Sequence, residues 1–294
     1  MVKISVVIPT HNREDVVGHA IDSALNQTMT DIEVVVVDDA STDDTRAVVE
    51  AYDDDRLTYV RHDVNRGGSA ARNSGIERST GEYVAFLDSD DEWRADKLSR
   101  QIGRLETRSE EWRAAYCGFR SERQSAVVSL VDNLLERETG IEGDTELLYA
   151  ILLLRFSHGG SSTLVVERSL VDELEGFDPT FSRHQDWEFL VRLLQRSRLA
   201  YVDAPLVTKH DTGVPDFETC LEARKRYLRK FSDIVVDLSL AGYPVIERHR
   251  FSLAKVAFAN GRHREGIALL RGSAAPHVRD YFGLGLAVYN GLNG

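Results

Sequence analysis

The sequence predicts an α/β fold, a doubly wound and mainly parallel sheet followed by a C-terminal helical region. Short, almost continuously apolar runs alternate with helical periods over the first hundred residues, which is typical of strands that crossover helices bury on both faces. After about residue 215 only helical periods remain. The chain has 294 residues, of which 42% are hydrophobic, so one large domain and an appendage can each bury a core.

Four apolar runs are the expected strands of the first half, at residues 4–8, 32–37, 57–60 and 83–87. The first should end at Pro9, which has no N–H to donate to a sheet. A helix is expected over 16–25 and another from about 68 to 78. Between them, residues 41–44 (STDD) resemble a capping box. That box should open a helix with three residues inward, Ala47, Val48 and Ala51.

The rest of the chain is predicted to continue with helices and two strands. The helices are expected over 97–105, 144–156, from 186, 216–240, 245–260 and 263–270, and the strands over 161–166 and 199–207, the latter broken by Pro205. The late apolar segment 281–292 is shorter than the ~20 residues that span a bilayer.

Charge and cysteine content restrict the function classes. The formal net charge of −12 argues against binding nucleic acid through its phosphates. Cys117 and Cys220 form neither a disulfide framework nor a zinc motif. The first residues have no signal-peptide layout, so we expect a cytoplasmic protein.

The most informative feature is the cluster Asp88-Ser89-Asp90-Asp91, which directly follows an expected strand. Carboxylates this close together repel one another unless a cation or solvent compensates. Mg²⁺ or Mn²⁺ prefers oxygen ligands and commonly bridges a carboxylate to diphosphate oxygens. The cluster therefore predicts a metal–diphosphate site, with a solvated acidic turn as the alternative.

Other polar segments also fall at expected strand ends, where ligands of such sheets bind. Asp38 and Asp39 could contact a ribose or base, or start a helix. Arg66-Gly67-Gly68 joins a phosphate-binding group to glycines that admit close approach, although a plain turn or a surface charge explains them equally well. Arg72 lies on the helix that follows. Residues 10–13 (THNR) end the first strand.

Asp186, at the start of a helix, is the candidate general base that would take a proton from an acceptor hydroxyl. The alternative is a helix-capping acid, because a helix N-terminus favours the ionised form and weakens a base. His184 is a second candidate base. Three other histidines have no metal-ligand spacing and are assigned to loops or core, namely His11, His158 and His210.

Four ordered motifs resemble those of the family 2 glycosyltransferases of the GT-A fold. They are residues 6–13 (VVIPTHNR), 36–43 (VVDDASTD), 65–73 (NRGGSAARN) and 81–91 (GEYVAFLDSDD). The likeness is close over about residues 3–100 and looser to about 210. It implies an inverting transfer of sugar from a nucleotide-sugar donor, with a UDP- or GDP-sugar as the expected donor and a glycan or lipid-linked molecule as the acceptor.

The resemblance also implies roles for individual residues. Asp186 would be the catalytic base, and Asp90, with Asp88, would hold the divalent cation. The donor would be bound by Pro9, His11, Arg13, Asp38, Asp39, Arg66, Gly67, Arg72, Asp88 and Ser89. Two positions depart from the family pattern, because His11 stands where Tyr is common and Gln185 replaces the Glu that usually precedes the base.

The predicted organisation is a GT-A domain over 1–212 and a helical region over 213–294. The domain divides into a nucleotide-binding half, 1–100, and an acceptor half, 101–212. Basic residues of the helical region, 224–226, 229 and 230, could attract anionic lipid at the cytoplasmic face of a membrane, although a solvated helix face is favoured. The alternative functions are a nucleotidyltransferase, which the lack of glycines after the first strand disfavours, and an inactive nucleotide-sugar-binding module.

Overall fold

A computed structural model describes residues 2–121, 140–210, 213–275 and 280–293. The described chain forms two compact units. The first, which contains the sheet, holds residues 2–121, 140–145 and 158–210, and the second, which is helical, holds 146–157 and the described residues from 213 onward. Residues 146–157, which the sequence groups with the first domain, therefore cluster with the later helices.

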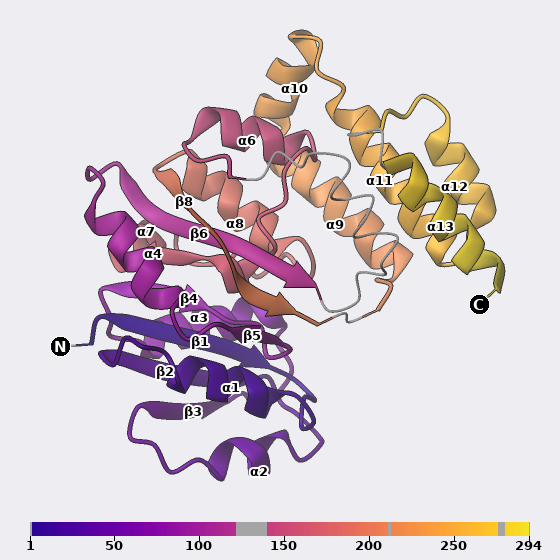
Figure 1. The fold of residues 1–294 in the computed structure, drawn as a ribbon. Helices are drawn as coiled ribbons and strands as arrows, with labels where there is room; N and C mark the ends of the chain where they lie inside the picture. The colour runs from indigo at the N-terminus through magenta and orange to yellow at the C-terminus, as the bar shows by residue number, and fades with distance from the viewer. Residues whose placement is uncertain (1, 122–139, 211–212, 276–279, 294) are drawn as a thin grey trace. The chain divides into compact units, whose positions relative to one another are not determined.

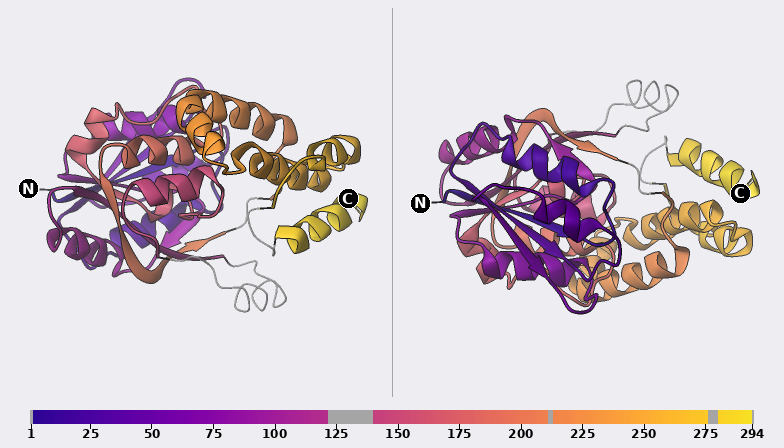
Figure 2. Two further views of the ribbon diagram at one scale, coloured as in Figure 1. Left: turned by 90° about the horizontal axis from the view of Figure 1, so that it is seen from above. Right: turned by 90° about the horizontal axis from the view of Figure 1, so that it is seen from below.

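The sheet unit is built on one mixed sheet with the strand order β3-β2-β1-β4-β7-β6-β8-β5. Figure 2 shows its strands enclosed by helices on both sides. The strands are β1 (Ile4–Thr10), β2 (Ile32–Asp38), β3 (Leu57–Arg61), β4 (Tyr83–Phe86), β5 (Asp91–Trp93), β6 (Trp112–Ser121), β7 (Val165–Glu167) and β8 (Arg198–Lys209). The α/β class predicted from the sequence is confirmed.

The first four strands are parallel, and helices cover both of their faces. Helix α1 (Val17–Leu25) packs on the face that carries Val6 and Ile8. Helix α3 (Gly68–Arg78) lies against the opposite face, where Ala71 contacts Val35 and Val37. Both faces of β1, β2 and β4 are thus buried, which explains why these strands read as continuous apolar runs. Strand β3, at the sheet edge, has no buried residue.

Two details of this half differ from the prediction. Strand β1 continues through Pro9 to Thr10, because Pro9 still pairs in register with Val37 of β2. Helix α2 (Thr45–Glu50) buries Thr45 and Val49, whereas Ala47 and Ala51 are exposed. The turn before α2 uses Asp43 as the acceptor for the Thr45 N–H, so the expected Ser41 cap does not form.

The second half of the sheet is mixed in direction. Strand β7 is antiparallel to β4 and β6, β8 is parallel to β6, and β5 pairs antiparallel with the end of β8. Pro205 does not break the strand as predicted, because β8 runs without interruption from Arg198 to Lys209. Instead the β6–β8 register shifts where Pro205 lies opposite Gly118. The expected strand over 161–166 is instead a 3₁₀ turn, η1 (Ser161–Thr163), followed by β7.

Helices complete the sheet unit (Figure 1). They are α4 (Lys97–Glu106), α7 (Arg168–Glu173) and α8 (Gln185–Leu194). Helix α8 begins one residue before Asp186, and its buried residues include Phe189, Leu190 and Leu193. The predicted helix from 186 is therefore confirmed, and it carries Asp186 in its first turn.

The helical unit contains α6 (Thr145–Leu152) and five later helices. These are α9 (Phe217–Lys230), α10 (Ser232–Leu240), α11 (Val245–Ala259), α12 (His263–Leu270) and α13 (Asp280–Asn293). The expected helix over 216–240 is interrupted at Phe231 and forms α9 and α10. Helix α11 packs against α9, α12 and α13. Within the described residues, no helix is both long and apolar enough to cross a bilayer.

Candidate active site

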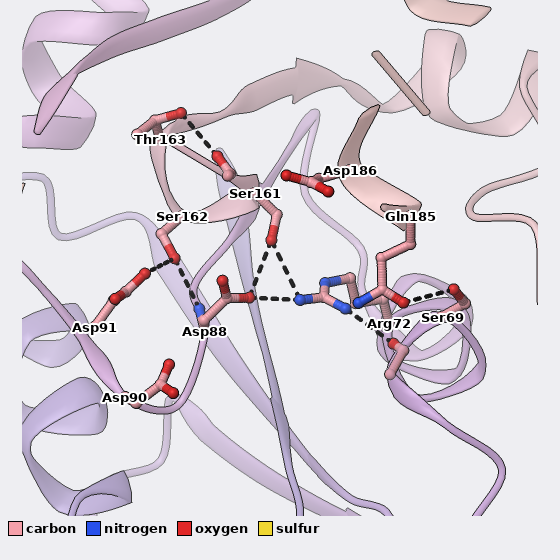
Figure 3. A network of polar contacts seen from close by, with 12 residues as sticks. Ser69, Arg72, Asp88, Asp90, Asp91, Ser161, Ser162, Thr163, Gln185 and Asp186 are labelled. Carbon is pink, nitrogen blue, oxygen red and sulfur yellow. Dashed lines mark hydrogen bonds and ion pairs between the residues drawn. The ribbon is translucent and has the colours of Figure 1, made fainter. Parts of the chain in front are cut away.

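The acidic loop after β4 is held by polar side chains from two distant segments (Figure 3). Asp88 Oδ1 accepts hydrogen bonds from Arg72 NH2 at 2.5 Å and from Ser161 Oγ at 3.0 Å. The backbone N–H of Asp88 donates to Ser162 Oγ at 3.0 Å. Burial acts to raise the pKa of Asp88, but Arg72 and Lys209 lower it below its ordinary value, so this carboxylate is ionised.

Asp91 has a different environment from Asp88, because it is the first residue of β5 and its side chain is only 1% exposed. Its Oδ2 accepts hydrogen bonds from Lys209 Nζ at 2.6 Å and Ser162 Oγ at 2.5 Å. Burial and the neighbouring Asp88 raise the pKa of Asp91 to about 6. The third acid of the motif is therefore buried, and its Oδ2 is bound by Lys209 of β8 and Ser162 of η1.

Asp90 is partly exposed, like Asp88, and its ion-pair partner is an arginine of the loop after β1. The Asp90 side chain is 21% exposed, and Arg13 NH2 lies 3.8 Å from its Oδ2. Burial and the charge of Asp88 raise the pKa of Asp90, and the opposing effect of Arg13 and Lys209 is smaller. Within the described residues no group of three or more His, Cys, Asp or Glu could hold a metal. Two carboxylates nevertheless fit Mg²⁺, which is usually bound by one or two carboxylates together with water and phosphate.

The acids at the end of β2 are almost completely buried, and their oxygens bind other parts of the protein. Asp38 accepts hydrogen bonds from the Ser41 N–H at 2.7 Å and from the Tyr59 hydroxyl at 2.6 Å. Asp39 accepts from His62 and from the backbone N–H groups of residues 66 and 67 at 2.7–2.8 Å. Burial opposes ionisation of Asp39, but these donors lower its pKa. Both acids thus order the loops at this edge.

The other residues expected to bind the donor lie on the loops around this edge. Pro9 and His11 are half-buried at the end of β1, and the Arg13 N–H donates to Thr45 Oγ1 at 2.8 Å. Arg66 is exposed, while Ser89 is buried beside Asp88. The structure joins Arg13 to Asp90, Arg72 to Asp88, and the Arg66-Gly67 backbone to Asp39.

Arg72 is buried in α3 and connects the acidic loop to the second half of the unit. Besides Asp88, its NH2 donates to Ser161 Oγ at 3.2 Å. Ser69, one turn earlier on α3, donates from Oγ to Gln185 Oε1 at 2.9 Å. Gln185 is thus bound to the helix that carries Arg72, and it precedes Asp186 on α8 (Figure 3).

The nearest basic side chain found for Asp186 among the described residues is His158, which is not one of the expected donor-binding residues. The Asp186 side chain is 24% exposed, and its Oδ2 lies 3.7 Å from His158 Nε2. A β-carbon placed on Gly160 would lie 3.8 Å from the same oxygen and 3.4 Å from Lys209 Nζ. The segment 158–160 therefore approaches both Asp186 and the Lys209 that binds the acidic loop.

Four side chains of this region were not assigned to it from the sequence. His158 was assigned to loop or core, and Ser161, Ser162 and Lys209 carried no prediction. The only local signal was the His-Gly-Gly segment before an expected strand. Lys209 reaches Asp91 through strand pairing across 118 positions, a relation that no local pattern displays.

Residues 5–140 match the family model described as glycosyl transferase family 2. The chain is 30% identical over 203 residues to the putative teichuronic acid biosynthesis glycosyltransferase TuaG of Bacillus subtilis, covering 67% of this chain and 74% of the relative. It is 29% identical over 171 residues to WfaP of Escherichia coli, a UDP-Glc:α-D-GlcNAc-diphosphoundecaprenol β-1,3-glucosyltransferase. That alignment covers 58% of this chain and 63% of WfaP.

Solved structures of similar fold have lower sequence identity. Staphylococcus aureus TarS 1–349 in complex with UDP-GlcNAc superposes with a TM-score of 0.61 at 18% identity, covering 99% of this chain and 92% of TarS 1–349. The mannosyltransferase PcManGT of Pyrobaculum calidifontis, in complex with GDP-Man and Mn²⁺, gives a TM-score of 0.54 at 21% identity, covering 98% of this chain and 73% of PcManGT. At these identities the similarity concerns the fold.

Proposed function

Because the chain belongs to glycosyltransferase family 2 and has the GT-A fold, we propose that it transfers a sugar with inversion from a nucleoside-diphosphate sugar to an acceptor hydroxyl, with Asp186 as the general base. One observation carries the assignment of the base. Asp186 is a partly exposed carboxylate in the first turn of α8, and it lies on the side of Ser161 that faces away from the acidic loop (Figure 3).

The proposed reaction is a single displacement. Asp186 takes the proton of the acceptor hydroxyl while the acceptor oxygen forms a bond to the anomeric carbon of the donor sugar. The bond between that carbon and the diphosphate oxygen breaks, and its electron pair leaves with the nucleoside diphosphate. Arg72 supplies positive charge on the side where the leaving group would develop negative charge.

The donor is proposed to lie across the loops that follow β1, β2 and β4. Arg13 and Arg72 would contact its phosphates, and the loop ordered by Asp39 would present the backbone of Arg66 and Gly67. The remaining residues of the proposed donor site are Pro9, His11, Asp38, Asp88 and Ser89. TarS and PcManGT were solved with UDP-GlcNAc and GDP-Man, which supports a UDP- or GDP-sugar as donor.

A divalent cation is proposed to bind at Asp90, with Asp88 as the second ligand. The neighbouring charge of Asp88 and burial raise the pKa of Asp90 despite Arg13, so added positive charge would stabilise its ionised form, and the Mn²⁺ in the PcManGT complex is in line with such a cation. When bound, the cation would neutralise charge on the departing diphosphate. Asp91 is left out of this set because Lys209 and Ser162 already bind its carboxylate.

The acceptor is proposed to be a growing glycan or a lipid-linked sugar. TuaG is named for teichuronic acid biosynthesis, and WfaP for a diphosphoundecaprenol-linked acceptor. Membership of family 2 sets aside the nucleotidyltransferase alternative. An inactive nucleotide-sugar-binding module remains as the outcome that the activity test below would reveal.

Peripheral contact with the cytoplasmic face of a membrane is part of this proposal. Large apolar side chains are exposed on α10, in the turn that follows it and at the start of α11, namely Val236, Leu240, Tyr243 and Ile246. Arg226, Arg229 and Lys230 of α9 are exposed as well. Arg224, which the sequence grouped with them, is buried at 3% exposure and donates to His249, so it cannot attract lipid headgroups.

Vesicle flotation tests the membrane contact. The protein should float with vesicles that contain anionic lipid, and Leu240→Glu should reduce the bound fraction because a charge then replaces an apolar contact. Ile267→Glu, at another exposed apolar position of the same unit, is the matched control and should bind like the unchanged protein. Failure of the unchanged protein to float would contradict the contact.

Asp186→Asn tests the function itself. With Mn²⁺ present, the unchanged protein should release nucleoside diphosphate from UDP- or GDP-sugars in the presence of an acceptor, and Asp186→Asn should lower transfer by at least about 100-fold. Its affinity for nucleoside diphosphate should not change. Asp90→Asn should instead weaken both nucleotide binding and its dependence on Mn²⁺. Asp53→Asn, at an exposed loop position, is the control and should transfer sugar like the unchanged protein. If the unchanged protein turns over none of the donors, the inactive nucleotide-sugar-binding module is the better interpretation.

A further inference from the structure

His158 is a buried histidine that neither the donor site nor the proposed reaction uses. Its side chain is 2% exposed, and its Nε2 has no hydrogen-bond partner among the described residues. The nearby acceptor is the Asp186 carboxylate, whose Oδ2 lies 3.7 Å from Nε2. This separation exceeds a hydrogen bond, but catalytic contacts in structures without substrate are often long and shorten in the reacting complex.

The backbone around His158 is fixed by the neighbouring 3₁₀ turn. Thr163 Oγ1 donates to the carbonyl oxygens of His158 at 2.8 Å and of Gly160 at 2.9 Å. The same turn carries Ser161 and Ser162, which bind the acidic loop. His158 thus lies just before the turn that binds the acidic loop, and its ring nitrogen Nε2 lies near the carboxylate of the proposed base.

The protonation state of the ring follows from its surroundings. Burial lowers the pKa of His158, and Lys209 on β8 acts in the same direction, whereas Asp186 on α8 and Asp88 after β4 oppose the shift. The ring is therefore neutral at neutral pH, and a neutral imidazole donates from one nitrogen. Full burial also prevents His158 from contacting an acceptor itself, whereas the side chain of Asp186 is 24% exposed.

We infer that His158 is a positioning residue for Asp186, whose Nε2–H holds one carboxylate oxygen of the base so that the other can meet the acceptor hydroxyl. The inference rests on the proposed role of Asp186 as base. In this role His158 does not itself contact the substrate. The role resembles that of groups which orient a catalytic base through a hydrogen bond and lose their effect when the base is absent.

Three substitutions of His158 test the inference. His158→Leu removes the donor, His158→Asn places an amide N–H near the position of Nδ1, and His158→Gln places one near Nε2. We expect Leu and Asn to lower kcat by about 10- to 100-fold, because a small displacement of a reacting group costs about that much. His158→Gln should recover most of the rate. The KM for donor and the affinity for UDP should stay within about twofold in all three, because the donor site is intact.

The controls separate this inference from the function on which it rests. His19→Leu, on the exposed side of α1, should leave turnover unchanged. Adding His158→Leu to Asp186→Asn should cause no further loss, because the histidine acts through the carboxylate. Full activity of Asp186→Asn would overturn the assignment of the base. An inactive Asp186→Asn together with a fully active His158→Leu, or with a His158→Gln as slow as a well-folded His158→Asn, would overturn the inference alone.

Discussion

Two buried arginines, one in each unit of the molecule, donate hydrogen bonds to partners of different charge. In the helical unit Arg224 is 3% exposed and donates to His249 Nδ1 at 2.8 Å. His249 Nε2 in turn contacts the Leu152 carbonyl at 2.8 Å. In the sheet unit Arg72 is 5% exposed and donates to the ionised Asp88, whose side chain is 27% exposed.

The difference shows how a buried charge can serve either folding or chemistry. Burial and the charge of Arg224 lower the pKa of His249 well below its ordinary value, so its ring is a neutral acceptor that links α9, α11 and the end of α6. Around Arg72, four carboxylates face three basic side chains. The acids are Asp88, Asp90, Asp91 and Asp186, and the basic residues are Arg13, Arg72 and Lys209. This is the region where the donor and the cation are proposed to bind.

Replacing each arginine by methionine gives the largest expected contrast. Arg72→Met should lower kcat/KM by more than about 100-fold, because Asp88 loses its partner and the leaving group loses a cation. Arg224→Met should leave kcat unchanged but lower the free energy of unfolding by about 1–3 kcal/mol, because His249 is left without its donor. Steady-state kinetics and thermal unfolding measure the two effects. A catalytic defect in a folded Arg224→Met would break the comparison.

The two halves of the sheet unit were predictable from the sequence to different degrees. Strands β1, β2 and β4 are recognisable because both of their faces are buried, so each is a local apolar run, whereas the edge strand β3 is only partly buried. Strand β5 has three residues, two of them acidic, which is too short to show a period. Strand β6 mixes Arg113, Tyr116 and Arg120 with small residues, and its identity comes from pairing with β7 and β8 rather than from its own pattern.

The candidate site shows the same division. The acidic loop could be located from its position after a buried strand, but the different environments of Asp90 and Asp91 could not. That difference depends on Lys209, which β5–β8 pairing brings to Asp91. Asp186 could be proposed from its motif, whereas the approach of His158 to it depends on a turn and a helix that lie 28 positions apart in the sequence.

Lys97 is a useful third case, because it is a buried lysine for which the described residues provide no ion-pair partner. It is 0% exposed, its Nζ lies 3.8 Å from the centre of the Trp93 ring, and no hydrogen-bond partner of Nζ is found among the described residues. Burial lowers the pKa of Lys97 to about 8. Lys97→Met should therefore raise the free energy of unfolding at pH 7 by about 2 kcal/mol, after allowing for the lost ring contact.

The free energy of unfolding should depend on pH in a direction set by the lowered pKa of Lys97. In the unfolded chain the amine keeps its proton up to its ordinary pKa of 10.5, whereas in the folded protein it loses the proton above about 8. The folded protein therefore gains stability as the pH rises between these values. The advantage of Lys97→Met should shrink over this range, as measured by chemical unfolding at pH 7 and pH 9.5. An advantage that grows with pH would show that Lys97 is compensated in the folded state.

The smallest expected difference in activity is between alanine substitutions at two glycines with positive φ. Gly160 has φ +86° and lies where a β-carbon would meet Lys209 Nζ at 3.4 Å and Asp186 Oδ2 at 3.8 Å, whereas Gly272 of the helical unit has φ +68° and nothing within 4 Å. Alanine at either position should cost about 1–2 kcal/mol of stability, because L-residues are strained there. Only Gly160→Ala should also slow transfer, by less than about fivefold, since its methyl group would touch Lys209 and the base at van der Waals distance and occupy space beside them. Equal kinetics for the two variants, with matched losses in thermal stability, would mean that the 158–160 segment supports the fold without shaping the space around Asp186.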